Sequence, residues 1–366
     1  MMKELLLEKK ILIVCGSGGV GKTTLSATLA LNAARLGRRA IVLTIDPAKR
    51  LANSLGLSQI GHEPQEIEAK VFKGCGISMP GALSAMMLDT KRTFDTIIER
   101  YAPNEATKTA ILNNPIYHHL SNMVAGSTEY MAMEKLYEVY SKGAYDLLVL
   151  DTPPTQHALD FLDAPSKMAN LLGDSLFKLL LKPSIFLGKK SFQVLQSGSK
   201  KLLRVLDKIV GFEFLQDLSV LFLTTGGMLE GFKERAEEVG KILRQDSTQF
   251  LLVATPNRLS IQESKFFLNK IQELELPFEN FIFNRVHSPL ENAWVAETNQ
   301  IFNKCDCVTA GKNLMTMYET LAKQDRTLIN KMKSELATPC TYTEISQFET
   351  DIHGPQGLVK IGNALL

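Results

Sequence analysis

The chain has 366 residues, of which 45% are hydrophobic, and its formal net charge is +2. This length allows one α/β domain with insertions or two to three smaller domains, and the near-neutral charge gives no reason to expect DNA or RNA as the main partner. Five mostly isolated cysteines favour a reducing cytosol over a disulfide framework. We see neither a secretory signal nor an uninterrupted apolar run of about 20 residues, the length that spans a membrane. We therefore expect a soluble, cytoplasmic protein that is not transmembrane.

Short apolar runs recur along the chain, and each ends in small or polar residues. Their continuous apolarity is typical of strands that are buried on both faces of a parallel sheet. Helical patterns separate most of them, for instance TTLSATLALNAARLG (23–37) and ESKFFLNKIQELELP (263–277). This alternation predicts a doubly wound, mostly parallel α/β sheet. The predicted strands are ILIVC (11–15), AIVLTI (40–45), YDLLVLD (145–151), SVLFLTT (219–225), FLLVAT (250–255) and FIFNRV (281–286).

Two intervals, residues 57–144 and 155–217, are too long for simple crossovers and lack clear strand patterns. We interpret both as insertions that form a helical subdomain within a single domain spanning 1–366. The first holds methionines that either line a surface for apolar clients or, as is commoner at helical spacing, belong to the core. The second is basic on one face and apolar on the other, which fits either a solvated helix or docking on an anionic membrane or an acidic partner. The methionines are Met79, Met86, Met87, Met123, Met131 and Met133.

The strongest local motif is the loop GSGGVGKTT, which lies between the first predicted strand and a helix. It fits the Walker A pattern of P-loop nucleotide hydrolases, G-x-x-x-x-G-K-[ST], without a mismatch. Backbone N–H groups of such a loop surround phosphate oxygens, and the following helix adds its positive dipole end. We expect Lys22 to reach the β/γ-phosphates of a nucleotide and Thr23 to ligate Mg²⁺. The predicted nucleotide-binding residues here are Gly16, Ser17, Gly18, Gly19, Val20, Gly21, Lys22, Thr23 and Thr24.

Three further predicted strands end in residues that suit the same site. Asp151 closes YDLLVLD, where a Walker B carboxylate faces the metal ion. Asp46 closes AIVLTI and either positions the attacking water or caps the loop that follows. FIFNRV contributes Asn284, which can contact the edge of a base, while His287 stands where the guanine-reading aspartate of N-K-x-D would lie. ATP is therefore favoured over GTP, and we interpret the N-K-x-D match at 303–306 as a coincidence.

The loop GSGGVGKTT, the TIDPA segment, DTPPTQHAL and the FNRV strand end occur in the order of the ArsA/Get-type ATPases. The chain resembles this family, which comprises the arsenite-pump ATPase and the tail-anchored-protein targeting ATPase, through to its last residues, DIHGPQGLVKIGNALL. The resemblance implies that Asp46 activates water, that Asn284 contacts adenine and that Ser346 to Phe348 belong to an adenine-side loop. Switch II is implied to include Asp151, Thr152, Pro153 and His157.

The resemblance also implies how such a protein works. Members act as dimers or pseudodimers that close over ATP with Mg²⁺ and open after hydrolysis. The helical subdomain then changes its binding surface, a switch set by the γ-phosphate. We therefore expect a homodimer, at least with nucleotide, and a hydrophobic polypeptide or a membrane protein as possible client.

Two departures limit this transfer. The family's loop normally reads G-K-G-G-x-G-K-T, and its first lysine crosses to the partner subunit's phosphates, whereas this chain has the uncharged Ser17. Either another cation replaces that lysine, with Lys49 and Arg50 nearest in sequence, or hydrolysis proceeds slowly without it. The second departure concerns zinc. The targeting ATPase of the family holds its dimer with a zinc-binding C-x-x-C, whereas this chain has only C-D-C at 305–307. Two thiolates one residue apart are a poor half-site for tetrahedral zinc.

These observations predict a Mg²⁺-dependent ATPase, with Asp46 and Lys22 as catalytic residues, whose turnover switches a helical partner-binding region. Two alternatives remain open. One is a partition or cell-positioning ATPase like the ParA/MinD group, and the other is a nucleotide-gated binding protein with negligible turnover, for which Ser17 is the motivating feature.

Overall fold

The computed structural model describes residues 2–45, 50–114, 117, 127–153, 229–290, 308–336, 340–349 and 352–366. The chain divides into two compact units. The first unit consists of Met1–Met87, Lys142–Leu159 and Leu243–Leu366, and the second of Leu88–Ser141 and Asp160–Ile242. The predicted insertion 155–217 and the predicted strand 219–225 lie outside the described residues.

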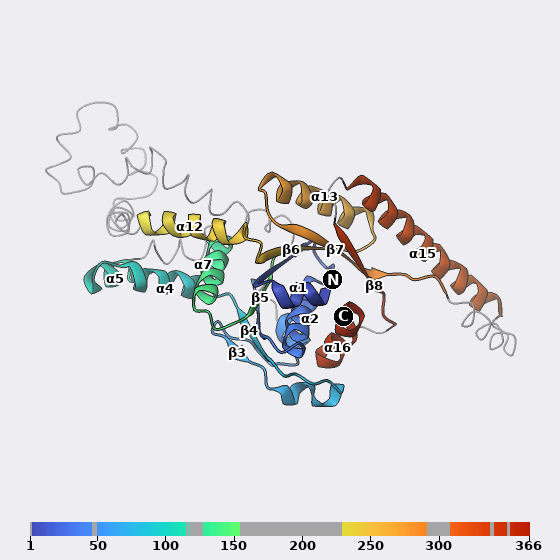
Figure 1. The fold of residues 1–366 in the computed structure, drawn as a ribbon, viewed down its shortest axis with the longest axis horizontal. Coiled ribbons are helices and arrows are strands. Elements are labelled where there is room, and N and C mark those ends of the chain that lie inside the picture. Colours follow the sequence, from blue (N-terminus) through green and yellow to red (C-terminus); the bar gives the residue numbers. More distant parts are fainter. Residues whose placement is uncertain are drawn as a thin grey trace, which may run out of the picture. The chain divides into compact units, whose positions relative to one another are not determined.

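The first unit is built on a twisted sheet whose strands, in the described residues, number eight (Figure 1). Their order across the sheet is β3-β4-β2-β5-β1-β6-β7-β8, and all neighbouring pairs are parallel except β3 with β4. This confirms the predicted doubly wound, mostly parallel α/β fold. The strands are β1 (Ile11–Gly16), β2 (Arg39–Thr44), β3 (Gln65–Glu66), β4 (Ala82–Met87), β5 (Leu147–Asp151), β6 (Thr248–Ala254), β7 (Phe278–Val286) and β8 (Thr341–Ser346).

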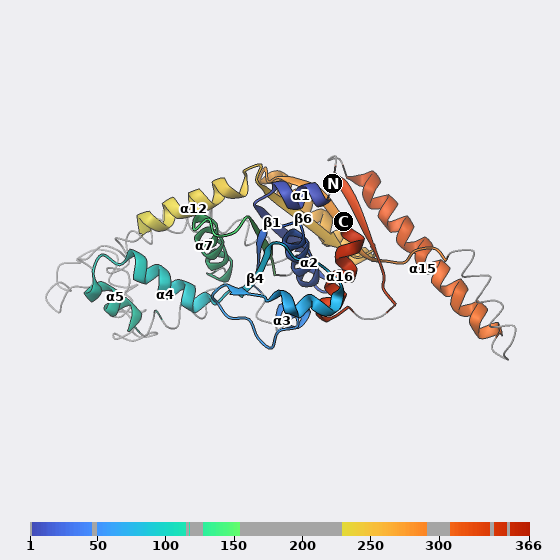
Figure 2. The ribbon, with the colours of Figure 1, turned by 60° about the horizontal axis from the view of Figure 1, so that its bottom comes forward.

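Helices cover both faces of this sheet (Figures 1 and 2). Leu12 and Val14 of β1 pack into a core cluster shared with α2 and α16, and Ile11 and Ile13, equally buried, point to the opposite face because strand side chains alternate. On that face α13 contacts β1 and β6, and α15 contacts α13 and β7. The helical segments of this unit are α1 (Met2–Glu8), α2 (Lys22–Arg35), α3 (Arg50–Ser54), the 3₁₀ segment η1 (Ala69–Cys75), α13 (Arg258–Glu273), α15 (Val308–Glu335) and α16 (Gly354–Leu365).

The last helix, α16, packs directly against α2, the helix that follows the glycine loop. The Asn32 side-chain amide donates to the carbonyl of Gly362 at 3.0 Å, and Arg35 donates to the Asn32 side-chain oxygen at 2.9 Å. A Cβ on Gly362 would lie 2.6 Å from that oxygen, so glycine allows the close approach. The two ends of the chain lie near each other (Figures 1 and 2).

The structure differs from the sequence interpretation within 57–144. The segment ALSAMM (82–87), which we read as part of a helical insertion, is strand β4 and pairs along its whole length with β2. Alanine, serine and methionine carry little intrinsic strand preference, so pairing with β2 decides the conformation. Strand β8 was likewise not predicted, because its half-exposed pattern at the sheet edge lacks a continuous apolar run.

The methionines of that interval are core residues wherever they are described. Met86 is buried in β4, and Met131 and Met133 are buried in the second unit. Met79 and Met87 pack, partly buried, against the core of the first unit, and Met123 lies outside the described residues. The core interpretation is thus confirmed for these five.

The second unit is helical in its described part. Asp89 and Asn104 cap the first two helices by accepting from backbone N–H groups three residues on. The guanidinium of Arg235 stacks over the rings of Tyr101 and Tyr137, with 5.4 and 4.2 Å to the centroids. Within the described ranges, no helix combines the length and the apolar character needed to cross a bilayer. The helices are α4 (Thr90–Tyr101), α5 (Glu105–Leu112), α7 (Ser127–Ser141) and α12 (Leu229–Leu243).

The packing of α16 on α2 leads to the first prediction. Leu358 is almost completely buried in the core cluster. We expect Leu358→Ala to lower the free energy of unfolding by about 2–5 kcal/mol, because it removes apolar contacts and leaves a cavity. Asn363→Ala, on the exposed side of the same helix, is the control and should change it by less than about 0.5 kcal/mol. Urea denaturation of both variants measures the difference, and equal stability would contradict the packing described.

Candidate functional site

The glycine loop begins at the carboxyl end of β1, the strand between β5 and β6 in the middle of the sheet. A Cβ on Gly16 would lie 2.2 Å from the carbonyl oxygen of Val253 in β6, so only glycine lets the loop start this close to its neighbour. Gly21, directly before α2, has a φ of 96°, in the left-handed region that favours glycine. The local sequence therefore builds the turn that a phosphate-binding loop requires.

The side chain of Lys22 folds back over this loop. Its Nζ donates to the carbonyl oxygens of Gly16 and Ser17, each at 2.9 Å, and the residue is buried. These bonds hold the ammonium group at the loop, where the P-loop pattern predicts it to meet phosphate oxygens. Thr23 and Thr24 follow in the first turn of α2 and are partly exposed.

Asn284, near the end of β7, joins that strand to the loop. Its side-chain amide donates to the carbonyl of Val20 at 2.8 Å, and its side-chain oxygen accepts from the backbone N–H of Arg285 at 3.0 Å. A Cβ on Gly21 would lie 2.5 Å from the Asn284 amide nitrogen, so the strand end rests against the loop at its glycine. Arg285 itself adopts a left-handed φ of 58°, a conformation that non-glycine residues rarely take.

A polar pocket of about 260 Å³ opens beside this contact. Residues of the segment after β8 line this pocket opposite the loop. The Gln347 backbone N–H donates to the carbonyl of Val286 at 2.8 Å. The Lys360 ammonium lies 4.8 Å from the centre of the Phe348 ring. The structure thus brings the predicted Asn284 together with the loop and with the predicted segment 346–348. The lining residues are Gly21, Thr24, Asn284, Arg285, Gln347, Phe348, Ile352, His353 and Ile361.

His287, which stands where a guanine-reading aspartate would lie, is not among the lining residues of this pocket. Its ring Nδ1 lies 2.8 Å from a carboxylate oxygen of Asp325 in α15, and its backbone N–H donates to the same oxygen at 2.9 Å. The Tyr318 ring packs edge-on against the imidazole, with 5.5 Å between centroids. The imidazole is therefore engaged with α15.

Asp151 and Thr152 lie at the carboxyl end of β5, next to β1. The Thr44 hydroxyl donates to the Asp151 carboxylate at 2.9 Å, and the Thr152 hydroxyl donates to the carbonyl of Val14 at 2.8 Å. Burial raises the pKa of the adjacent Cys15 thiol to about 12, an effect that the nearby Asp151 adds to. The buried Asp151 carboxylate and the Thr23 hydroxyl are oxygen donors, the kind of ligand that Mg²⁺ prefers. These two residues therefore fit the expected ion.

Several predicted residues lie outside the described part of the chain: Asp46, Lys49, His157 and the 303–307 segment with its two cysteines. Pro153 is described and follows Thr152 directly, and Arg50 begins α3 with an exposed side chain. Among the described residues, no group of three or more His, Cys, Asp or Glu side chains is arranged to hold a metal ion.

The Ser17 side chain points toward α13 of the same chain. Its hydroxyl lies 2.9 Å from the hydroxyl of Ser260 in the first turn of α13, and both residues are buried. Ser260 was not predicted as part of the site. The sequence signal that was present, an asparagine three residues before a serine at the start of a helical pattern, indicates only a helix cap.

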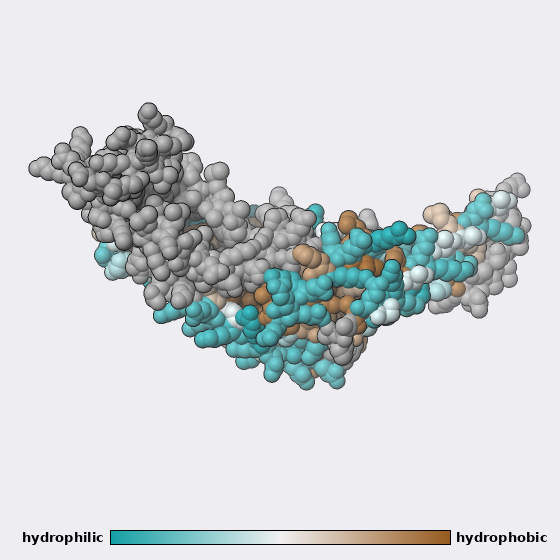
Figure 3. Space-filling view, turned by 90° about the horizontal axis from the view of Figure 1, so that it is seen from above, coloured by the Kyte–Doolittle hydropathy of each residue, from teal (hydrophilic) through white to brown (hydrophobic). Residues whose placement is uncertain are grey.

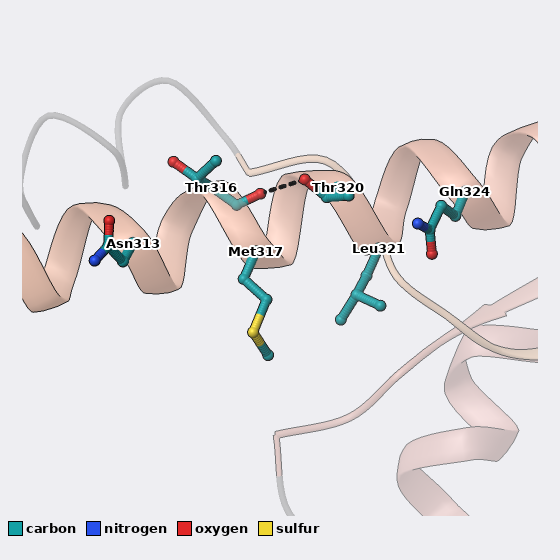
Figure 4. A pocket seen from close by; sticks show the side chains of 6 residues that line it. All are labelled: Asn313, Thr316, Met317, Thr320, Leu321 and Gln324. Carbon is teal, nitrogen blue, oxygen red and sulfur yellow. Dashed lines mark hydrogen bonds between the residues drawn. The ribbon is translucent and has the colours of Figure 1, made fainter.

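Two further cavities are formed on the helices that cover the other face of the sheet. One, of about 460 Å³, is lined by uncharged residues of α15, where Met317 and Leu321 project to the same side of the helix (Figure 4). The other, of about 540 Å³, lies between α13 and α15 and has Arg258, Lys265 and Lys331 in its lining. Figure 3 shows apolar residues among hydrophilic ones on this side of the molecule. The exposed large apolar residues of α13 and α15 include Leu259, Phe266, Leu314 and Met317.

The contact between Gly21 and Asn284 generates the second prediction. We expect Gly21→Ala to lower the free energy of unfolding by about 1–3 kcal/mol without nucleotide, because alanine is strained at a φ of 96° and its Cβ meets the Asn284 amide. Gly18→Ala is the matched control from the same loop, since a Cβ there meets no atom within 4 Å. Denaturation of the nucleotide-free proteins compares them, and equal stability of the two variants would show that the loop is not held at Gly21.

Comparison with known proteins places this chain in a family. The model of a family described as anion-transporting ATPase matches residues 9–348. "ATPase ASNA1 homolog 1" of Paramecium tetraurelia is 28% identical over 285 residues, which cover 76% of each chain. "ATPase get3" of Schizosaccharomyces pombe is 25% identical over 77% of this chain and 76% of its own, and "ATPase GET3" of Malassezia globosa is 26% identical over 99% and 93%. Since the family model matches nearly the whole chain, the chain belongs to the anion-transporting ATPases of the ArsA/GET3 type.

Proposed function

We propose that this ATPase binds ATP with Mg²⁺ at the glycine loop and hydrolyses it, and that this turnover switches a helical partner-binding region. One observation carries the proposal: Asn284 joins the loop to a pocket of about 260 Å³ that extends from Thr24 to Phe348. A phosphate chain on the loop and a base in this pocket would then belong to one nucleotide. The Asn284 and Gln347 amides offer polar contacts for adenine.

At the phosphate end, the roles follow from the chemistry of the side chains. Lys22 would exchange the carbonyl oxygens of Gly16 and Ser17 for the more strongly charged phosphate oxygens. The Thr23 hydroxyl and the Asp151 carboxylate would hold Mg²⁺, which neutralises charge on the phosphoryl oxygens when bound. Thr44, which donates to Asp151, would fix the orientation of that carboxylate.

The water-positioning role of Asp46 remains part of the proposal and rests on the family resemblance. The peptide that leads to it leaves the carboxyl end of β2, next to β5, since Ile45 donates its backbone N–H to the carbonyl of Asp151 at 3.2 Å. Ligand sites of open α/β sheets lie at this carboxyl end of the strands. A general base at this edge would act on water aimed at the γ-phosphate.

The partner side of the proposal rests on the family match. We infer a homodimer with nucleotide bound and a hydrophobic polypeptide or membrane protein as client. The family match over residues 9–348 favours this function over a ParA/MinD-like one. One observation favours an alternative, a nucleotide-gated binding protein with negligible turnover. Position 17 carries an uncharged serine whose hydroxyl is engaged by Ser260, so it has no cation to act on a neighbouring subunit.

Phosphate release tests the chemistry. We expect Lys22→Ala and Asp151→Asn to lower the rate of ATP hydrolysis about a hundredfold or more, since each removes a charge that stabilises the transition state. Asp146→Asn is the control for Asp151→Asn, because Asp146 precedes the opposite end of β5 and pairs with Arg39 on the surface. Lys73→Ala, at an exposed lysine of η1, is the control for Lys22→Ala. Turnover of GTP as fast as ATP, or activity of either site variant at the wild-type rate, would contradict the proposal.

The dependence of assembly and ATP hydrolysis on protein concentration distinguishes a dimer-coupled ATPase from a nucleotide-gated binding protein. We expect the mass measured by analytical ultracentrifugation with a non-hydrolysable ATP analogue and Mg²⁺ to be that of a dimer, as closed two-fold assembly is the commonest arrangement. Hydrolysis per molecule that rises with concentration would support a dimer-coupled ATPase. Tight ATP binding without phosphate release would instead support the nucleotide-gated binding protein, and a monomeric mass would rule out the dimer.

A further inference from the structure

We propose that Ser260 is a positioning residue for the phosphate loop: it holds Ser17 inside the protomer and thereby sets the affinity of the loop for nucleotide. Ser260 reaches the loop through the hydroxyl of Ser17. This inference rests on the proposed nucleotide site.

The contact is a short chain of hydrogen bonds that starts at the end of β6. The backbone N–H of Thr255 donates to the Ser260 hydroxyl oxygen at 3.1 Å, and that hydroxyl pairs with the Ser17 hydroxyl at 2.9 Å. The backbone N–H of Ser260 donates to the side-chain oxygen of Asn257, the N-cap of α13, at 2.8 Å. Because Asn257 supplies the cap, the Ser260 side chain is available for the loop.

Residue 17 is therefore fixed at two points. Its hydroxyl is bound to Ser260, and its carbonyl oxygen accepts from the Lys22 ammonium at 2.9 Å. The exposed fractions of Ser17 and Ser260 are 4% and 3%, so water does not readily replace a bond lost between them. Such a fixed residue lowers the ordering cost that the loop would otherwise meet when nucleotide binds.

The same geometry explains why a serine suits position 17. The side chain at 17 points toward α13 within its own protomer, where a small hydroxyl fits and is satisfied. A lysine there would either bury an unpaired ammonium group or turn outward and break the contact with Ser260. The loop thus keeps its shape without a charge at position 17.

A double-mutant cycle on nucleotide binding tests the proposal. We expect Ser17→Ala and Ser260→Ala each to raise the Kd for ADP about five- to tenfold, the range for loss of one buried hydrogen bond. The double variant should be no worse than either single variant, because the same bond is lost in all three. Isothermal titration calorimetry measures the Kd, and Ser260→Thr, which keeps the hydroxyl, should restore most of the affinity.

The matched control lies one turn further along α13. Ser264 is completely buried, and its hydroxyl has no hydrogen-bond partner within the described residues, so Ser264→Ala should leave the Kd unchanged. Kinetics add a second readout: Ser260→Ala should raise the KM for ATP and leave kcat within about twofold, as expected for a residue that shapes binding.

The outcomes distinguish this inference from the proposed function. If Lys22→Ala still binds ADP with wild-type affinity, the nucleotide site itself is wrong. If Lys22→Ala loses binding while Ser260→Ala keeps the wild-type Kd, only the positioning role is wrong. A lower melting temperature of Ser260→Ala with an unchanged Kd, or additive losses in the double variant, would also overturn it by showing a purely structural role.

Discussion

The amide of Asn284 donates to the carbonyl of Val20, and this contact joins two parts of the chain that are 264 residues apart in sequence. It presses the end of β7 against Gly21 so closely that a Cβ would lie 2.5 Å from the amide nitrogen. The left-handed turn before α2 is thereby held from outside the loop. Without it, a run of glycines would sample many conformations, since glycine loses more freedom on folding than any other residue.

Two other anchors complete the support, and each comes from a different element. Lys22 ties the beginning of the loop to the first turn of α2, and Ser260 binds Ser17 from the start of α13. All three anchors are hydrogen bonds between buried groups, for which an unmade bond costs more than a made bond gains. The loop is therefore specified by the end of β7 and by the first turns of α2 and α13, in keeping with ligand sites at the carboxyl ends of parallel strands.

The sequence predicted the parts of this arrangement that short stretches encode. The strand before the loop, the Walker A pattern and α2 follow from local apolarity and glycine spacing, and Asn284 was found because it closes an apolar run. Strand β4 escaped prediction because ALSAMM has no strand preference of its own and depends on pairing with β2. Ser260 left no usable signal, since its partner Ser17 lies 243 residues away and serine near a helix start is common.

The C-terminal segment has a consequence for how the protein is made. Gln347, Phe348 and Ile361 line the same pocket as Gly21 and Thr24, and α16 packs on α2. A chain emerging from the ribosome exposes its glycine loop first and completes the pocket only after α16 has emerged. Until then the apolar face of α2, where α16 will lie, has no cover from that helix. The pocket beside the glycine loop is therefore complete only when α16 is present, and a chain that stops before α16 would lack part of its lining.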